Sequence, residues 1–480
     1  MTAPMQTTLY SFLGFLFVFL AVGLLSVRKS RKSAEDYLLA SRDVGSCFAG
    51  LSGAATTASG FAFTGIVGFA YHAGFSASWL ILGAVIGSMI AFFFTVRRLR
   101  THSQRQGATS YSEFLTHNLG RGKRVVQVVI GLVTLVALSL YASGQLAAGS
   151  KALHVLFDWD YKMGAILGAI MVVLYCFAGG IRASIWTDVA QSVVMLAAVY
   201  VLMWVALSKV GGFGGLHDRL YAIDPAMVDW LPRDNPYGKV MFLLGWFFLG
   251  VGFIGFPHVM VRFMTVRKPK YAMQALLWYQ GYYIVFYFAA VTVALTTRLL
   301  VDSAATGGTF DSELALPLLA LDLLPPVLVG LVLAGIFAST ISTADSLILS
   351  CTASLSRDLF TRWRDSYVFL KICTFLVTVF ALGLALFGSQ SVFSLILLSI
   401  SIMSAAFAPI LIVRVMRWPL DSLTALAMMA GGVGTVMWWR FAGLHIHVND
   451  AFPGFMAALL SYGLMRIVLH FCKRIVRKKS

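Results

Sequence analysis

Apolar runs long enough to cross a lipid bilayer recur along the whole chain of 480 residues. A transmembrane helix needs about 20 consecutive, mostly apolar residues. Thirteen runs meet this requirement, and they leave no room for a soluble domain: 8–27, 46–71, 76–96, 125–148, 161–178, 185–208, 240–262, 273–301, 326–352, 368–388, 391–413, 422–440 and 453–471. The sequence therefore predicts a single transmembrane domain over residues 1–480 that is entirely α-helical.

The composition agrees with a chain built for lipid. Apolar residues make up 59% of it and charged residues only 12%, whereas soluble domains have about 45–50% and about 25%. These values exclude soluble enzymes, fibrous proteins and disordered chains. The five cysteines are scattered, mostly in apolar runs, without the spacing of a metal site, so we interpret them as packing residues.

The net charge of +17 has a topological explanation. Most of the Lys and Arg residues fall in the odd-numbered connections between runs and in the C-terminal tail. The positive-inside rule then places these connections in the cytoplasm, with the N-terminus outside the cell membrane and the C-terminus inside. The basic residues orient the helices, and we expect no nucleic acid as a partner.

Two runs depart from the uniform Leu, Val and Ile that would be enough to fill the membrane. Residues 50–60 are small except for Leu51, and four glycines precede Pro257 in 245–257. Glycine and proline weaken a helix by about 1 and about 3 kcal/mol relative to alanine, and interrupted helices in corresponding halves indicate the central site of a transporter. Each interrupted run opens a set of five, over about 46–208 and about 240–413. Because five is odd, the two sets cross the membrane in opposite senses. Alternatively, the small residues only allow close helix packing.

A stripe of hydroxyls lies in the run over 326–352. Ser339, Ser342, Thr343 and Ser346 follow the i, i+3, i+4, i+7 rule and therefore share one helix face. Neutral oxygen ligands suit a small hard cation and can also release it. The alternative is that these hydroxyls bond to carbonyls of their own helix, which is common for Ser and Thr.

Few carboxylates lie at membrane depth. Asp345 is deep in the run over 326–352, and Asp188 is near the cytoplasmic end of the run over 185–208. Intramembrane carboxylates mark ion paths or structural pairs, and both roles stay open for Asp345. For Asp188 we expect a place on a release path or a helix-capping role.

Four stretches together carry a family resemblance. They are Asp36-Tyr37 with Ser41-Arg42, Leu51-Ser52 and Ser59-Gly60; residues 179–183 with Trp186-Thr187-Asp188 and Gln191; residues 252–258 with Arg262; and residues 341–346 with Ser356-Arg357-Asp358. In order and spacing they resemble the sodium/solute symporter family, which includes carriers of proline, pantothenate, sugars and sialic acid. The resemblance implies a LeuT-like fold of two inverted five-helix repeats, with one extra N-terminal helix over 8–27 and two C-terminal helices over about 422–471.

The resemblance also implies a sodium site between the runs over 46–71 and 326–352. Its ligands would be backbone carbonyls of Ala55, Ala58 and Ser339 and hydroxyls of Ser342 and Thr343. Asp188 matches the family aspartate on the sodium release route.

Positions that line the solute site match less completely. They are Thr57, Ser59, Ser78, Tyr141 and Phe253. Proline carriers often have an aspartate where this chain has Thr57 and a tryptophan where it has Leu249. These departures weaken an assignment to proline and argue against a second, Asp-assisted ion site.

The function we expect is secondary active transport and not catalysis. A sodium ion, the only metal expected, would drive symport of a small polar organic solute into the cell, such as an amino acid, a small carboxylate or a vitamin. No obligatory protein partner is evident beside the lipid bilayer. The alternatives are a transporter-like solute sensor, although the tail has no room for an output domain, and a symporter coupled to protons through Asp345 or Asp188. An intramembrane enzyme lacks a His/Asp/Ser constellation in the runs.

Overall fold

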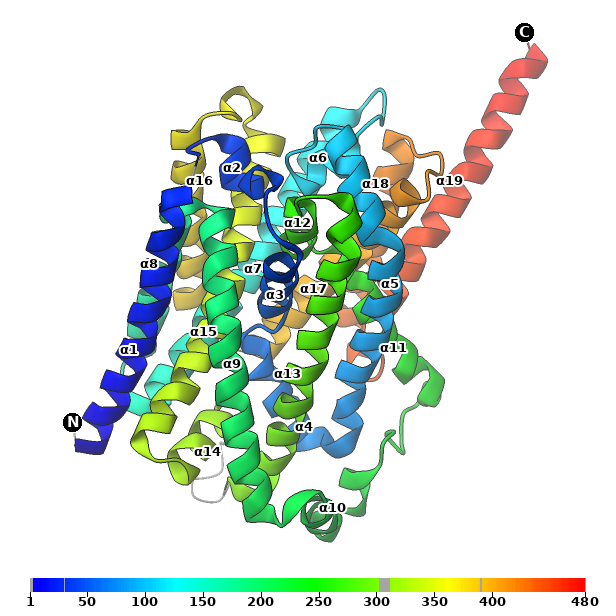
Figure 1. Cartoon of the computed structure of the whole chain (residues 1–480). Coiled ribbons are helices and arrows are strands. Elements are labelled where there is room, and N and C mark those ends of the chain that lie inside the picture. Colours follow the sequence, from blue (N-terminus) through cyan, green and yellow to red (C-terminus); the bar gives the residue numbers. More distant parts are fainter. Residues whose placement is uncertain (1–2, 30, 302–310, 389–390, 480) are drawn as a thin grey trace.

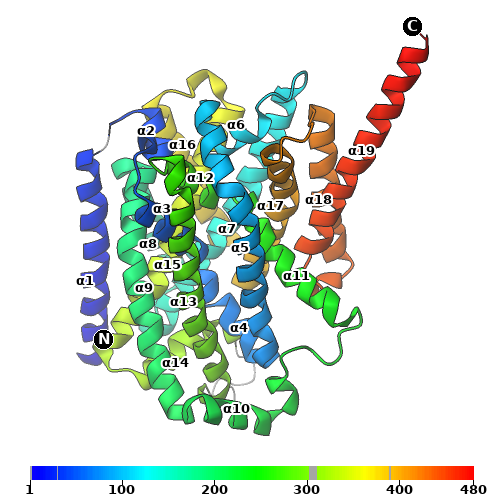
Figure 2. The same cartoon turned by 45° about the vertical axis from the view of Figure 1, so that its right-hand side comes forward.

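The helices of this computed structural model form one bundle with roughly aligned axes (Figures 1 and 2). It describes residues 3–29, 31–301, 311–388 and 391–479. Helix α1 (Ala3–Ser26) begins at one end of the bundle, and α19 (Ala451–Lys479) extends beyond the other. The chain thus begins and ends at opposite ends of the bundle, as an odd number of membrane crossings would require.

Eleven helical stretches of the described residues are long and apolar enough to cross a membrane. Two of the thirteen predicted runs fall outside this count. The run over 46–71 is interrupted, and the apolar part of α8 (Tyr161–Gly179) is the shorter helix Tyr161–Phe177. The other long helices are α5 (Ser78–Arg105), α7 (Lys123–Phe157), α9 (Ile181–Val210), α13 (Ala272–Leu300), α15 (Pro326–Ser354), α16 (Tyr367–Phe387), α17 (Val392–Val415) and α18 (Ser422–Phe441).

Both glycine-rich runs are divided, as the sequence predicts. The first consists of α3 (Ser46–Thr57), the 3-10 turn η3 (Gly60–Ala62) and α4 (Gly65–Ala73). The second consists of α11 (Gly238–Gly252), η6 (Phe253–Gly255) and α12 (Pro257–Thr265). We call residues 58–64 the first break and residues 253–256 the second break.

Four short helices in the connections were not predicted. Helices α2 (Ala34–Leu39) and α6 (Tyr111–Thr116) lie at the end of the bundle where α19 emerges, and α10 (Gly212–Ile223) and α14 (Ala315–Leu323) lie at the opposite end (Figure 1). We call these the α2–α6 end and the α10–α14 end. Such helices are too short to span a membrane, so a search for long apolar runs does not find them.

Burial separates central helices from lipid-facing ones. In α15 83% of the most apolar stretch is buried, against 17% in α19. Helix α15 packs against α7, α9 and α1. Large apolar side chains such as Phe17 and Trp204 are exposed on the outside of the bundle, where a bilayer would cover them. The high apolar content therefore reflects the outer surface as much as the core.

The glycines of the divided helices also allow close packing. A Cβ atom at Gly250 would collide with the Ala84 backbone, and one at Gly252 with the Ser404 side chain. At Gly255 it would lie 2.7 Å from the Met403 carbonyl oxygen. The packing explanation of the small residues is therefore correct alongside the interruption of the helices.

Some basic residues that the sequence places in connections are buried in the structure. Arg182 lies in α9, where its Nη2 donates to Asp36 Oδ1 (2.6 Å) and to the Ala40 carbonyl oxygen (2.8 Å). Burial raises the pKa of Asp36, but hydrogen bonds from Arg182, the Arg31 N–H and Ser41 outweigh it and hold the pKa below its ordinary value. This pair fastens α2 to α9 at the α2–α6 end. Lys151 is also buried, in α7.

Candidate functional site

The first break frees carbonyl oxygens at the end of α3, and hydroxyls from other helices accompany three of them. Ser342 Oγ lies 3.5 Å from the Ala55 oxygen, Thr343 Oγ1 donates to the Thr56 oxygen (2.9 Å), and Tyr287 donates to the Thr57 oxygen (3.2 Å). The last carbonyls of a helix have no partner within it, and in lipid they must be satisfied by protein, water or ligand. Helices α13 and α15 perform this role here.

Four of the five groups implied for sodium lie together. The Ser339 carbonyl oxygen accepts from Ser342 (3.2 Å) and Thr343 (3.0 Å), and the Ala55 oxygen is beside Ser342. The fifth residue, Ala58, follows as the C-terminal cap of α3. All five residues are buried. The hydroxyl stripe therefore both bonds to its own helix and faces α3, so the two explanations of it are compatible.

The C-terminal end of α3 and the hydroxyl stripe also favour a cation electrostatically. A helix C-terminus carries a partial negative charge that favours cations. The Thr56 hydroxyl lies 3.1 Å from the Ser346 hydroxyl, so the last turn of α3 runs directly along α15. Carbonyl and hydroxyl oxygens from two helices thus converge at a negative helix end.

A buried arginine lies next to this group. Arg262 of α12 is fully buried, and its guanidinium contacts hydroxyls from three other helices: Ser52 (3.3 Å), Ser184 (2.7 Å) and Ser346. Its Nη2 is 3.5 Å from Asp188 Oδ2, which also accepts from Ser52 (2.6 Å). We call Arg262, Asp188, Asp345 and these serines the Arg262 cluster. The sequence singled out Arg262 only as part of a motif.

Two carboxylates face this one guanidinium. Asp345 Oδ1 accepts from Ser184 and Ser346, both at 3.0 Å. Asp345 Oδ2 and Asp188 Oδ1 have no hydrogen-bond partner among the described residues. A capping role for Asp188 is wrong, because α9 begins at Ile181, with Gly180 as its cap.

A cavity lined mainly by aromatic side chains lies between the two breaks. We call it the aromatic cavity. Its aromatic members are Phe61, Tyr141, Phe253, Phe256, His258, Tyr283 and Tyr287. Aliphatic side chains from α4, α5, α11 and α17 close the remaining sides, and no Asp, Glu, Lys or Arg side chain lines it among the residues described. Such mostly apolar walls with a few polar groups are typical of small-molecule sites.

Three of the five residues expected near the solute line this cavity, namely Thr57, Tyr141 and Phe253. Ser59 is adjacent, because its hydroxyl accepts from Tyr141 (3.2 Å). Ser78 is not brought there. It begins α5, half-buried, while Leu80, Ile81 and Ala84 of the same helix reach the cavity.

The sequence interpretation missed the aromatic face of α13. Tyr279, Tyr283 and Tyr287 recur every four residues and therefore share one side of the helix. Tyr283 and Tyr287 line the cavity, and Tyr279 donates to Thr57 Oγ1 (3.0 Å). The four-residue spacing could have revealed this face. His258 was missed as well, because nothing in its local sequence shows that it is turned into a cavity.

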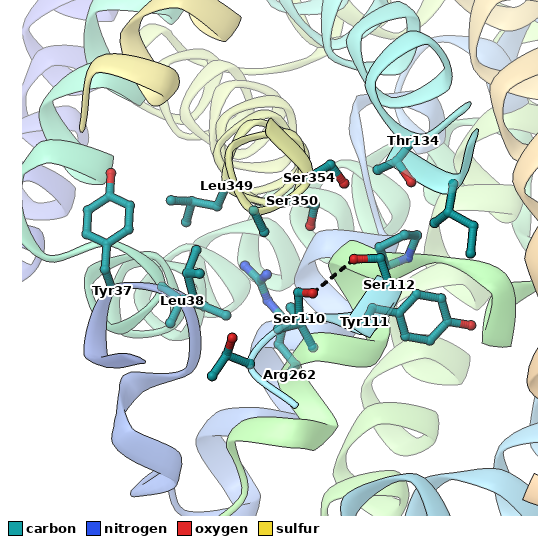
Figure 3. Close-up of a pocket in the computed structure, with 16 residues that line it drawn as sticks. Tyr37, Leu38, Ser110, Tyr111, Ser112, Thr134, Arg262, Leu349, Ser350 and Ser354 are labelled. Carbon is teal, nitrogen blue, oxygen red and sulfur yellow. Dashed lines mark hydrogen bonds between the residues drawn. The ribbon is translucent and has the colours of Figure 1, made fainter. Parts of the chain in front are cut away.

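A second cavity lies toward the α2–α6 end, and Figure 3 shows the side chains that line it. Residues of α2, α6 and α15 surround it, and Arg262 lies among them. Many of its side chains carry hydroxyls, including Ser110, Ser112 and Ser350. Because both Arg262 and residues of α2 and α6 line it, this polar cavity lies between the Arg262 cluster and the α2–α6 end. In the described part of the chain, no group of three His, Cys, Asp or Glu residues could hold a metal ion.

Comparison with known proteins agrees with this architecture. The Sodium:solute symporter family matches residues 37–432. The chain belongs to this family. Among its relatives, the high-affinity proline transporter PutP of Bacillus subtilis (strain 168) is 28% identical over 449 residues, covering 92% of this chain and 94% of that protein. The sodium/proline symporter of Staphylococcus aureus (strain JH9) is 26% identical over 461 residues, covering 92% and 89%.

Solved structures show the same fold. A Na+-coupled sialic acid symporter superimposes with a TM-score of 0.78 at 19% identity, covering 95% of this chain and 97% of that one. MhsT in complex with L-phenylalanine superimposes with a TM-score of 0.57 at 17% identity, covering 87% and 98%. The fold is therefore LeuT-like. Family membership makes the chain a multi-pass, sodium-coupled solute transporter and not an enzyme.

Proposed function

We propose that this protein uses an inward sodium gradient to carry a small organic solute into the cell. The observation that supports this most is the meeting of Ser342 and Thr343 with the free carbonyls of α3. In the proposal, sodium binds the Ala55, Ala58 and Ser339 carbonyls and these two hydroxyls. Small rotations of the hydroxyls would turn their oxygen lone pairs from the helix carbonyls to the ion.

The charges nearby fit one added cation. With both carboxylates ionised, Asp188 and Asp345 against Arg262 leave one negative charge in a buried cluster. An uncompensated buried charge is unfavourable, so a monovalent cation beside the cluster stabilises it. Asp188 would then attract the ion toward the polar cavity during release. One charge crossing about 100 mV supplies about 2.3 kcal/mol.

Alternating access would expose the aromatic cavity to one end of the bundle at a time. At the α10–α14 end, Lys151 Nζ is 2.6 Å from Glu313, which also accepts from the Phe393 N–H (2.9 Å). These contacts join α7, the segment before α14, and the start of α17, and so close that end. The opposite end has the polar cavity. We propose thirteen crossings with the N-terminus outside, which makes the closed end the external one.

The solute is an amino acid or a similarly small molecule. The proline transporters among the relatives favour an amino acid, and the proposal extends that class to this chain. Thr57 and Leu249, which differ from the usual residues of proline carriers, both line the cavity. They alter its size and charge, so the preferred solute need not be proline.

Purified protein in proteoliposomes tests the proposal. An inward sodium gradient with an inside-negative potential should drive accumulation of at least one member of a panel containing L-proline, pyruvate, pantothenate and D-galactose. A potassium gradient of equal size should drive no accumulation of these solutes. Solute binding without accumulation would instead identify a sensor and contradict the proposal.

A proton-coupled mechanism is the second candidate. It is favoured by the buried oxygens of Asp188 and Asp345 that have no partner among the described residues. A proton gradient without sodium would then drive uptake. The sodium proposal predicts that it does not.

A further inference from the structure

His258 is fully buried, yet neither nitrogen of its ring has a hydrogen-bond partner among the residues described. Buried polar groups in native proteins are nearly always paired, so an unpaired one requires an explanation. A neutral imidazole has one donor and one acceptor nitrogen, and here both are unused within the protein.

The ring is held firmly and lines the aromatic cavity. It stacks on Phe256 with centroids 5.5 Å apart and planes 17° apart. Tyr141 meets it edge-on at 5.9 Å. The ring is therefore fixed by packing, without help from its nitrogens, and it is positioned to hydrogen-bond a molecule in the cavity.

The other polar side chains nearby are already engaged. The Tyr141 hydroxyl donates to Ser59, and the Tyr287 hydroxyl donates to the Thr57 carbonyl oxygen. Thr57 Oγ1 donates to the Gly53 carbonyl oxygen (2.9 Å). His258 thus contributes hydrogen-bonding capacity that these groups have already used.

The surroundings favour an anionic group at the ring. His258 is the second residue of α12, a helix of nine residues that starts at the second break. A helix N-terminus carries a partial positive charge and exposes backbone N–H groups, and both attract carboxylates. No lysine or arginine lines this cavity among the residues described, and Arg262 of the same helix donates instead to the His258 carbonyl oxygen and to the hydroxyls of its cluster.

We propose that His258 donates a hydrogen bond to the carboxylate of the transported solute, while the aromatic and aliphatic walls hold its apolar body. The proposal rests on the transport function above. It narrows the substrates to small monocarboxylates, including neutral amino acids, and argues against polyols and sugars, which need many more polar partners.

The test measures sodium-driven uptake in proteoliposomes with His258→Phe, which keeps an aromatic ring and lacks both nitrogens. With L-proline as probe, the KM should rise about 10- to 100-fold, the range for losing a hydrogen bond to a charged group. Binding of ²²Na+ without solute should stay unchanged. His258→Asn, which restores a donor near Nδ1, should recover part of the affinity.

A matched control is Tyr175→Phe. The Tyr175 hydroxyl is buried and has no hydrogen-bond partner among the described residues, but it does not line the aromatic cavity. Loss of the Tyr175 hydroxyl should leave the KM unchanged.

A competition assay uses L-prolinol, which lacks the carboxylate. The wild type should prefer L-proline over L-prolinol, and this preference should largely disappear in His258→Phe.

An unchanged KM and an unchanged preference in His258→Phe would overturn the proposal. So would a wild type that accumulates D-galactose with sodium but neither L-proline nor pyruvate, although the transport function would then stand. Absence of sodium-driven uptake of every probe would instead contradict the transport function itself. If His258→Phe does not fold, His258→Asn and His258→Gln are compared with wild type in the same competition assay.

Discussion

The two breaks lie in corresponding helices but are built from different residues. The first break follows a helix end made of Gly, Ala, Ser and Thr, and its exposed carbonyls meet hydroxyls of α15. The second break contains Phe253 and Phe256, and Pro257 and His258 follow it. The side chains of Phe253, Phe256 and His258 line the aromatic cavity. Small residues expose backbone, and large residues cover it. The end of α3 at the first break therefore suits an ion, whereas the second break, together with Phe61 of the first, suits an organic solute.

The strongest way to break this comparison is to remove the hydroxyls opposite the first break. The double variant Ser342→Ala with Thr343→Val should reduce sodium-stimulated uptake at least about 100-fold, because an ion would lose two of five ligands of a kind worth about 1.5–3 kcal/mol each. Uptake is measured in proteoliposomes at several sodium concentrations.

Thr340→Val is the matched control. Thr340 lies on the same helix, but within the described part of the chain its hydroxyl donates only to the Phe337 carbonyl oxygen (2.9 Å). Sodium dependence should survive in the control. Normal sodium dependence in the double variant would show that the ion does not bind at the first break.

A substitution at Gly250, before the second break, tests the packing of that region. Gly250→Ala would press a Cβ atom into the Ala84 backbone, so it should destabilise the protein by about 1–3 kcal/mol. Thermal unfolding in detergent measures this. Gly281→Ala, in α13, meets no atom within 4 Å of the new Cβ beyond the adjoining backbone of its own helix, and should be neutral or stabilising. Equal stability of both variants would show that α11 and α5 adjust freely.

Tyr111 provides a more selective test of the second break. Its buried hydroxyl donates to the Ile254 carbonyl oxygen (2.7 Å), which connects α6 to η6. Tyr111→Phe leaves this carbonyl unpaired, which costs about 1–3 kcal/mol, and transport should slow about tenfold. Tyr462→Phe, which loses an exposed bond to the Pro419 carbonyl oxygen, should behave as wild type. Wild-type initial rates of transport in Tyr111→Phe would show that this contact of α6 has no part in the transport cycle.

The smallest effect is expected at Ser78. The family resemblance places this residue near the solute, but the structure places it at the start of α5, away from the aromatic cavity. Ser78→Ala should change the KM for L-proline less than about twofold, within the usual range for a surface-like substitution. A larger change would mean that the cavity extends toward the start of α5 during transport.

The bundle and the first break could be predicted because their signals are local. Long apolar runs give the helices, and the Ser/Thr spacing in α15 gives a face that the structure turns toward α3. The Arg262 cluster could not be predicted in the same way. Arg262, Ser184 and Ser346 come from three helices and meet only through tertiary packing.

The solute cavity was harder to anticipate for a related reason. An aromatic residue in a transmembrane helix usually packs, and only its neighbours in space show whether it lines a cavity. His258 and Tyr287 are of this kind. The short α2 and α6 could not be found in this way because their apolar stretches are brief, although both contribute to the lining of the polar cavity.

Binding of ²²Na+ to the purified protein without any solute tests most directly whether the ion and the solute bind at different breaks. The account predicts that Ser342→Ala with Thr343→Val abolishes this binding, while His258→Phe retains it and loses only affinity for L-proline. Sodium binding that survives the first variant, or that disappears in the second, would contradict the assignment of the ion to the first break and the solute to the second.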